Sequence, residues 1–92
     1  MNTVPVWRVE FLAEAARELR KLGPEPERLV LRYLRQRIAV ADDPRRFGRP
    51  LTGDLKGFWR YRVGDYRIVA SIEDDRFIVL VVTVGHRREV YD

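Results

Sequence analysis

The sequence predicts a single α+β domain, in which an antiparallel helix hairpin packs on one face of a mostly antiparallel four-stranded sheet. Three observations predict it: a β-rich segment opens the sequence, two segments of helical periodicity follow, and three β-rich segments with tight connections come last. The 92 residues suffice for one compact domain but not for two. We therefore expect residues 1–92 to fold as one unit, in the order β-α-α-β-β-β.

The first half of the chain carries the predicted opening strand and both helices. Residues 4–11 alternate in part between apolar and polar side chains, which favours a strand. Residues 12–22 have apolar side chains at three- and four-residue steps, as an amphipathic helix does, and Gly23-Pro24 ends that pattern. A second helix is predicted from about residue 25 to residue 41 on the same periodicity.

The second half of the chain is predicted to form a loop and then a β-meander. Residues 42–57 are rich in Asp, Pro, Gly and Arg without periodicity, which is typical of a loop. Strands are predicted at residues 58–63, 66–72 and 76–84, joined by the tight connections Gly64-Asp65 and Asp74-Asp75. The last strand is almost entirely β-branched or aliphatic, so we expect it in the centre of the sheet, buried on both faces.

Composition narrows the class of protein. Hydrophobic residues make up 46% of the chain, enough for a packed core, and there is no cysteine for a disulfide or a thiolate metal site. The lack of cysteine favours the cytoplasm, and because no apolar stretch approaches the roughly 18–20 residues of a membrane span, we expect no membrane partner. The formal net charge is +4 and the pI about 10.0, which favours polyanionic partners.

The basic residues are almost all arginine, with Lys21 and Lys56 as the two lysines. Arginine offers phosphate a planar, bidentate fork, so this bias suits a nucleic-acid-binding protein. A genome of high GC content would enrich arginine in the same way. Composition alone leaves both interpretations open.

The register of the predicted meander places arginines together. A two-residue connection at Gly64-Asp65 makes Val63 and Tyr66 cross-strand partners, and counting outward sets Arg62 opposite Arg67. Alternation puts Arg60 on the same face. Like charges placed opposite each other destabilise a sheet, which suggests that an anion binds here. The alternative is a solvated face with nearby carboxylates as counter-charges, namely Asp54, Asp65 and Glu73.

The end of the sequence adds further polar candidates. Gly85 is followed directly by the single histidine, His86, then by Arg87 and Arg88, and Tyr91 comes three residues later. Strict alternation would place His86 on the face of Arg67, but a glycine can turn the chain, so the orientation is left open. A lone histidine is more often structural than catalytic, and Tyr91 could equally anchor the core.

Two blocks of the sequence resemble a known family. The run LTGDLKGFWRYRVGDYRIV at residues 51–69, followed by VGHRREVY at residues 84–91, resembles the RelE branch of the RelE/ParE toxin superfamily. The resemblance covers essentially the whole chain and implies the same succession of a strand, a helix hairpin and an antiparallel sheet. It also implies a toxin of a type II toxin-antitoxin system, an endoribonuclease that cleaves mRNA in the ribosomal A site and is inhibited by a cognate antitoxin protein.

The resemblance implies roles for individual residues. A catalytic set and an RNA-binding set are expected: Arg67, Arg87, Tyr91 and His86 for catalysis, and Arg60, Arg62, Lys56 and Arg88 for RNA binding. The family's best-known member often has lysine at the first-strand positions that hold Arg60 and Arg62 here, which puts a lysine general base in doubt. No convincing carboxylate–histidine cluster is present, so we expect attack by the RNA 2′-hydroxyl without a metal or cofactor.

Two alternative functions stay open at this point. A ParE-like toxin would share the fold but inhibit DNA gyrase without cutting RNA, although the GHRREVY ending favours the RelE branch. The second alternative is a basic nucleic-acid-binding module without catalysis.

Overall fold

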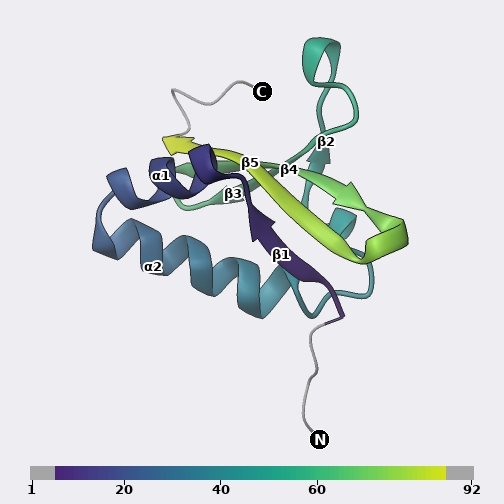
Figure 1. Cartoon of the computed structure of the whole chain (residues 1–92), viewed down its shortest axis with the longest axis horizontal. Coiled ribbons are helices and arrows are strands. Elements are labelled where there is room, and N and C mark those ends of the chain that lie inside the picture. The colour runs from purple at the N-terminus through teal and green to yellow at the C-terminus, as the bar shows by residue number, and fades with distance from the viewer. Residues whose placement is uncertain (1–5, 87–92) are drawn as a thin grey trace, which may run out of the picture.

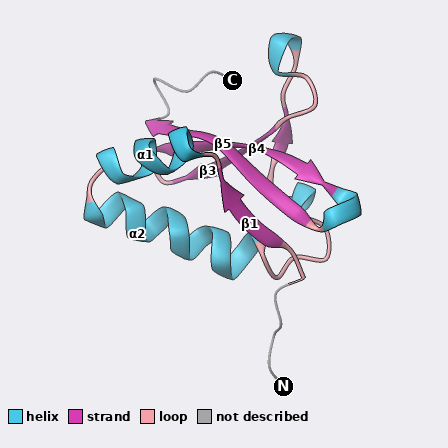
Figure 2. Cartoon of the chain, viewed as in Figure 1, coloured by secondary structure: helices cyan, strands magenta, loops and turns pink. Residues whose placement is uncertain are grey.

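The computed structural model describes residues 6–86 and shows a mixed sheet with a helix hairpin packed on one face (Figures 1 and 2). The elements in order are β1 Arg8–Phe11, α1 Ala13–Lys21, α2 Pro24–Tyr33 with a π-helical turn Leu34–Ile38, a 3₁₀ turn Pro44–Phe47, β2 Arg49–Pro50, a 3₁₀ turn Gly53–Leu55, β3 Trp59–Val63, β4 Tyr66–Glu73, a 3₁₀ turn Asp74–Arg76 and β5 Ile78–His86. The strand order is β1-β5-β4-β3-β2, with β1 parallel to β5 and every other pair antiparallel. The predicted α+β class is confirmed, and the sheet gains a fifth strand, β2, from the segment expected to be loop.

The helix hairpin begins and ends as local sequence preferences dictate. α1 buries Ala15 and Leu19, which lie one turn apart. Basic residues in its last turn interact favourably with the negative end of the helix dipole. Gly23 follows with φ of 102°, a conformation that costs a side-chain-bearing residue energy. Pro24 then occupies the first turn of α2, where its missing N–H removes no hydrogen bond.

α2 changes geometry before it ends. The α-helix ends at Tyr33 and continues as a π-helical turn, closed by a hydrogen bond from the Ala39 N–H to the Leu34 carbonyl at 2.8 Å. The carbonyl of Ala39 accepts the backbone N–H groups of Val6 and Trp7 at 3.0 and 3.1 Å. The end of the predicted second helix thus anchors the segment that leads into β1.

The core lies between the helix hairpin and one sheet face. Helical residues such as Val30 and Ile38, both 0% exposed, pack in one cluster with sheet residues such as Tyr61, Ile68 and Val81, also 0% exposed. Each fully buried aliphatic side chain contributes about 1.5–3 kcal/mol relative to an exposed one. No helix within residues 6–86 is long and apolar enough to span a membrane.

β5 departs from the register that the sequence predicted. The β4–β5 connection is longer than Asp74-Asp75, because it includes a 3₁₀ turn and Phe77 in a left-handed conformation with φ of 53°. A bulge follows: Ala70 pairs with Val81 and Val69 with Thr83, which leaves Val82 as an extra residue on β5. β5 is nevertheless central in the sheet, between β1 and β4, as predicted.

The bulge reverses the side-chain alternation in the last part of β5. Beyond Val82, Val84 pairs with Ile68 and becomes a core residue that is 2% exposed. By the same alternation His86 pairs with Tyr66, and their rings meet edge to face with centroids 5.8 Å apart. His86 therefore lies on the face of Tyr66, whereas strict alternation through the predicted short connection would place it on the face of Arg67.

Candidate nucleic-acid interface

The sheet face opposite the helix hairpin carries the predicted arginines. Arg62 pairs with Arg67 across β3 and β4, as the sequence predicted, and Arg60 lies two residues before Arg62 on the same face. Tyr61 and Val63, between and beyond them, point into the helix-side core. We call the surface formed by Arg60, Arg62 and Arg67 the arginine face.

The arginine face is apolar at its base and cationic at its surface. Val69, the β4 partner of Arg60, is only 1% exposed. The Nε atoms of Arg60 and Arg67 are buried, whereas Arg62 is exposed. Long arginine stems cover apolar surface in this way while the charged ends stay near solvent.

The three carboxylates that the sequence offered as counter-charges form no ion pair with Arg62. Glu73 forms an ion pair with Arg76 at 3.1 Å, and neither Asp54 nor Asp65 forms an ion pair with another residue in the range 6–86. Arg62 likewise has no ion-pair partner within those residues. None of these three carboxylates is therefore paired with Arg62, and a bound anion at this face stays a prediction.

The other predicted site residues lie apart from the arginine face or outside the described range. His86 is half-buried against Tyr66 on the opposite side of the sheet. Lys56 is exposed on the β2–β3 connection, which projects from the body of the molecule in Figure 1. Arg87, Arg88 and Tyr91 lie outside the described residues, although Arg87 is bonded directly to His86 at the end of β5.

Sequence reasoning missed a residue beside the arginine face. β2 pairs with β3 and sets Arg49 opposite Arg60. β2 has only two residues, too few for any alternation to be visible in the sequence. The signal that remained was Pro50, because proline is tolerated on an edge strand.

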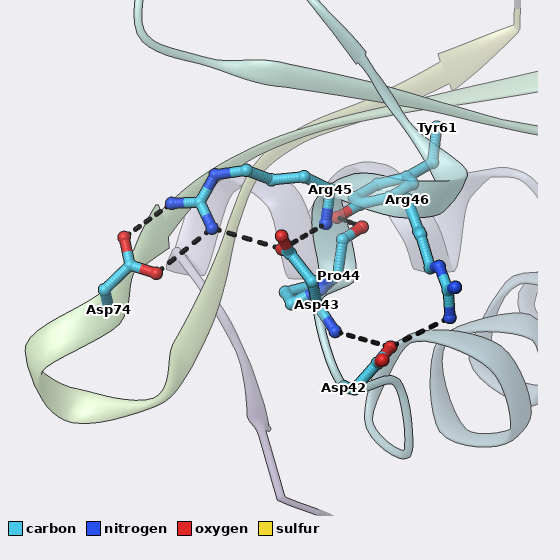
Figure 3. A network of polar contacts seen from close by, with 7 residues as sticks. All are labelled: Asp42, Asp43, Pro44, Arg45, Arg46, Tyr61 and Asp74. Atoms are coloured by element: carbon cyan, nitrogen blue, oxygen red, sulfur yellow. Dashed lines mark hydrogen bonds and ion pairs between the residues drawn. The ribbon is translucent and has the colours of Figure 1, made fainter.

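Carboxylates hold the arginines of the segment after α2 (Figure 3). Arg45 donates two hydrogen bonds to the Asp74 carboxylate, one of them at 3.1 Å to Oδ1, and a third at 3.2 Å to Oδ1 of Asp43. Its guanidinium also lies over the Trp59 ring, 5.8 Å from the centroid. We call Arg45 with Asp43 and Asp74 the Arg45 clamp; it ties the segment after α2 to the turn between β4 and β5.

Burial and hydrogen bonding shift the pKa values around the clamp. The hydrogen bond from Arg45 lowers the pKa of Asp74 and raises that of Arg45 itself. Desolvation by burial raises the pKa of Tyr61, whose hydroxyl donates a hydrogen bond to the Pro44 carbonyl at 2.8 Å. Tyr61 is therefore a neutral hydrogen-bond donor at physiological pH, which fits a structural role.

The arrangement is suited to binding a polyanion. The arginine face supplies positive charge, but the only side chain whose ordinary pKa lies near neutrality, His86, is on the other face. Within residues 6–86 no group of three or more His, Asp or Glu side chains gathers as a metal site. A partner with regularly spaced phosphates matches these side chains.

Comparison with known proteins identifies the family. A family model described as "ParE toxin of type II toxin-antitoxin system, parDE" matches residues 9–91. Toxin RelG of Mycobacterium tuberculosis is 33% identical over 88 residues, covering 92% of this chain and 95% of the relative. Toxin RelE of the same organism is 33% identical over 86 residues, covering 92% and 86% of the two chains.

Solved structures agree with the sequence comparison. A chain in the M. tuberculosis toxin-antitoxin complex RelBE2 superposes with a TM-score of 0.76 at 34% identity, covering 91% of this chain and 100% of that one. A chain in the archaeal RelE–RelB complex of Pyrococcus horikoshii superposes with a TM-score of 0.69 at 25% identity, covering 92% and 99%. These matches show that the chain belongs to the RelE/ParE family of type II toxin-antitoxin toxins, with RelE-type toxins among its relatives in both sequence and structure.

Proposed function

We propose that this toxin is an endoribonuclease that cleaves mRNA in the ribosomal A site, by attack of a ribose 2′-hydroxyl and without a metal. The observation that carries the proposal is the Arg62–Arg67 cross-strand pair, with Arg60 beside it, on a sheet face that the helices leave uncovered. Two like charges held opposite each other favour a bound anion, and the phosphates of RNA supply one.

The proposed reaction needs three chemical contributions. A base removes the 2′-hydroxyl proton, the oxygen attacks the adjacent phosphorus, and an acid protonates the departing 5′-oxygen, which leaves a 2′,3′-cyclic phosphate. Arg67 and Arg87 are proposed to stabilise the charge that develops on the phosphorane oxygens, and loss of one such donor typically lowers a rate about 10²–10³-fold. Arg60 and Arg62, with Lys56 and Arg88, are proposed to hold neighbouring phosphates.

The proton carrier is proposed to be Tyr91. An arginine is a poor base because its pKa exceeds about 12, and His86 lies against Tyr66 on the opposite face of the sheet. Tyr91→Phe keeps the aromatic ring but removes the hydroxyl, so a strong loss of cleavage is expected. Full activity in Phe together with a loss in Ala would assign Tyr91 to base stacking instead.

Ribosome dependence is proposed because of the composition of the arginine face. The described residues supply charge there but no neutral-pH base, so orientation of the mRNA by the ribosome would provide a large part of the rate. The test compares cleavage of one mRNA on translating ribosomes and free in solution, mapped by primer extension. We expect cuts in the A-site codon and little cleavage of free RNA; equal cleavage in both would contradict ribosome dependence.

Inhibition of DNA gyrase is the second candidate function, because the matching family model is described as a ParE toxin. A supercoiling assay with purified gyrase separates the two. Gyrase inhibition without RNA cleavage would assign the chain to the ParE branch, while cleavage of ribosome-bound mRNA without gyrase inhibition supports the RelE branch.

A cognate antitoxin is the proposed cellular partner, in the cytoplasm. The relatives from M. tuberculosis and P. horikoshii were solved as complexes of toxin with antitoxin. With a net charge of +4, the toxin favours an antitoxin segment that is acidic or amphipathic and that masks the arginine face. Expression of the toxin alone should arrest growth, and co-expression of the protein encoded beside it should restore it; unimpaired growth with the toxin alone would contradict the proposal.

A further inference from the structure

We infer that Arg49 is a further RNA-binding residue and that β2 widens the arginine face by one strand. This inference rests on the proposed RNA-cleaving function and names a residue that the resemblance does not include. Arg49 pairs with Arg60 across β2 and β3, and Arg62 pairs with Arg67 across β3 and β4. Cross-strand partners share a face, so two arginine pairs stand side by side on the uncovered side of the sheet.

The charge on Arg49 is available, unlike the charges of its neighbours in sequence. Arg45 is held by Asp43 and Asp74, and Arg46 forms an ion pair with Asp42 at 3.0 Å. Arg49 is exposed and forms no ion pair within residues 6–86. The same short segment therefore contains arginines whose charge is already compensated and one whose charge is not.

The backbone of β2 is seated closely on β3, so the position of Arg49 is well defined. A Cβ atom added to Gly48 would come within 3.0 Å of Tyr61 Cε1 and 3.2 Å of the Arg60 carbonyl oxygen, so a larger residue here would push Tyr61 or the β3 backbone aside. On the other side of the pair, the Leu51 N–H donates to the Phe58 carbonyl at 3.0 Å. The Arg45 clamp fixes the segment from the direction of α2.

Arg49 extends the cationic surface over three neighbouring strands. Strands lie about 4.8 Å apart, so the surface from Arg49 on β2 to Arg67 on β4 is about 10 Å wide across the strands. A surface of that width contacts more than one phosphate of a single-stranded RNA. Arg49 is thus proposed to bind a phosphate next to those held at β3 and β4, and to position the RNA without taking part in the chemistry.

Binding of an uncleavable RNA tests this assignment in the full-length toxin. A fluorescent, fully 2′-O-methylated oligoribonucleotide removes the nucleophile, and anisotropy titrations at several salt concentrations give the affinity and its salt dependence. Arg49→Ala should weaken binding about tenfold, as loss of a hydrogen bond to a charged group does, and should lower the slope of log K against log salt by about 0.7. Its melting temperature should be unchanged or higher, since a like charge opposite Arg60 is gone.

Two matched variants show whether the effect belongs to the position. Arg46→Ala removes the same charge from the same segment but from a side chain engaged by Asp42, so it should bind RNA like the native chain. Arg49→Lys keeps the charge without the planar fork, and should retain the salt slope while losing part of the affinity.

The outcomes separate this inference from the proposed function. If Arg49→Ala binds RNA as tightly as Arg46→Ala while Arg62→Ala binds weakly, the assignment of Arg49 is wrong and the arginine face stands. If none of the three variants differs from the native chain, or the native chain does not bind RNA, the inference is overturned, and the proposed function is decided separately by cleavage of ribosome-bound mRNA. Weak binding by both Arg49→Ala and Arg49→Lys, with lower melting temperatures in both, would assign Arg49 to stability and overturn the inference.

Discussion

The arginine face and the Arg45 clamp use the same residue type in opposite ways. In the clamp, Arg45 is surrounded by the carboxylates of Asp43 and Asp74 and lies on the Trp59 ring. On the arginine face, Arg62 is set opposite another arginine, and no ion pair balances it within residues 6–86. We therefore expect Arg45 to stabilise the fold, whereas Arg62, set opposite a like charge, is expected to cost stability in the free protein.

The largest expected effect is on catalysis. Arg67→Ala should reduce cleavage of ribosome-bound mRNA about 10²–10³-fold, because a preorganised charge donor is lost, and Arg87→Ala should do the same. Single-turnover cleavage on stalled ribosomes measures the rate, with Arg46→Ala as a charge-matched control. Near-native cleavage by Arg67→Ala would show that Arg67 has no catalytic role.

The next largest effect is expected on stability, from the hydrogen bond between Tyr61 on β3 and Pro44 in the segment after α2. Tyr61→Phe leaves the buried Pro44 carbonyl without its donor and should lower the free energy of unfolding by about 1–2 kcal/mol. Tyr33→Phe is the matched control, because the Tyr33 hydroxyl makes no hydrogen bond within the described residues. Urea unfolding of both variants gives the difference, and equal stabilities would show that this bond contributes nothing.

A smaller effect is expected from pH at the clamp. The hydrogen bond from Arg45 lowers the folded-state pKa of Asp74, so its stabilising contribution is full above the unfolded pKa and is lost as pH falls through the folded value. Asp74→Asn should melt lower than the native chain at pH 7, and the gap should close in acid. If the difference in melting temperature stays constant down to pH 2, the charge of the Asp74 carboxylate does not contribute to the stability of the clamp.

The smallest expected effect is a difference in stability between a variant of the arginine face and a variant of the Arg45 clamp. Arg62→Ala should leave the free energy of unfolding unchanged or raise it by a few tenths of a kcal/mol, because it removes a like charge opposite Arg67. Arg45→Ala should lower it, by up to about 1 kcal/mol for a largely surface ion pair. Thermal unfolding of the two variants at low salt compares them, and a clear loss of stability in Arg62→Ala would place Arg62 among the structural arginines.

The sequence could predict the arginine face because one short connection determines the register. The two-residue turn Gly64-Asp65 leaves a single way to pair β3 with β4, so Arg62 and Arg67 follow by counting. The resemblance to the RelE/ParE family indicated the same side chains independently of the register.

The position of His86 could not be predicted for an equally local reason. The bulge adds Val82 inside an uninterrupted apolar run, where no glycine or polar residue marks it. The longer β4–β5 turn was not predicted either, because it includes Phe77 in a left-handed conformation, which is rare for an aromatic residue. Arg45 and Arg49 also look alike in sequence, because the contacts of Arg45 with Asp74 and Trp59 form only in the folded chain.

β2 has a further consequence, for the behaviour of the free toxin in solution. An outermost strand exposes unpaired backbone groups, and through them molecules of one protein join edge to edge and aggregate. Here that strand has two residues, Arg49 and Pro50; proline offers no N–H to an incoming strand, and the arginine repels a second copy of the same edge. The short, charged border that widens the cationic surface therefore also protects this side of the sheet against self-association.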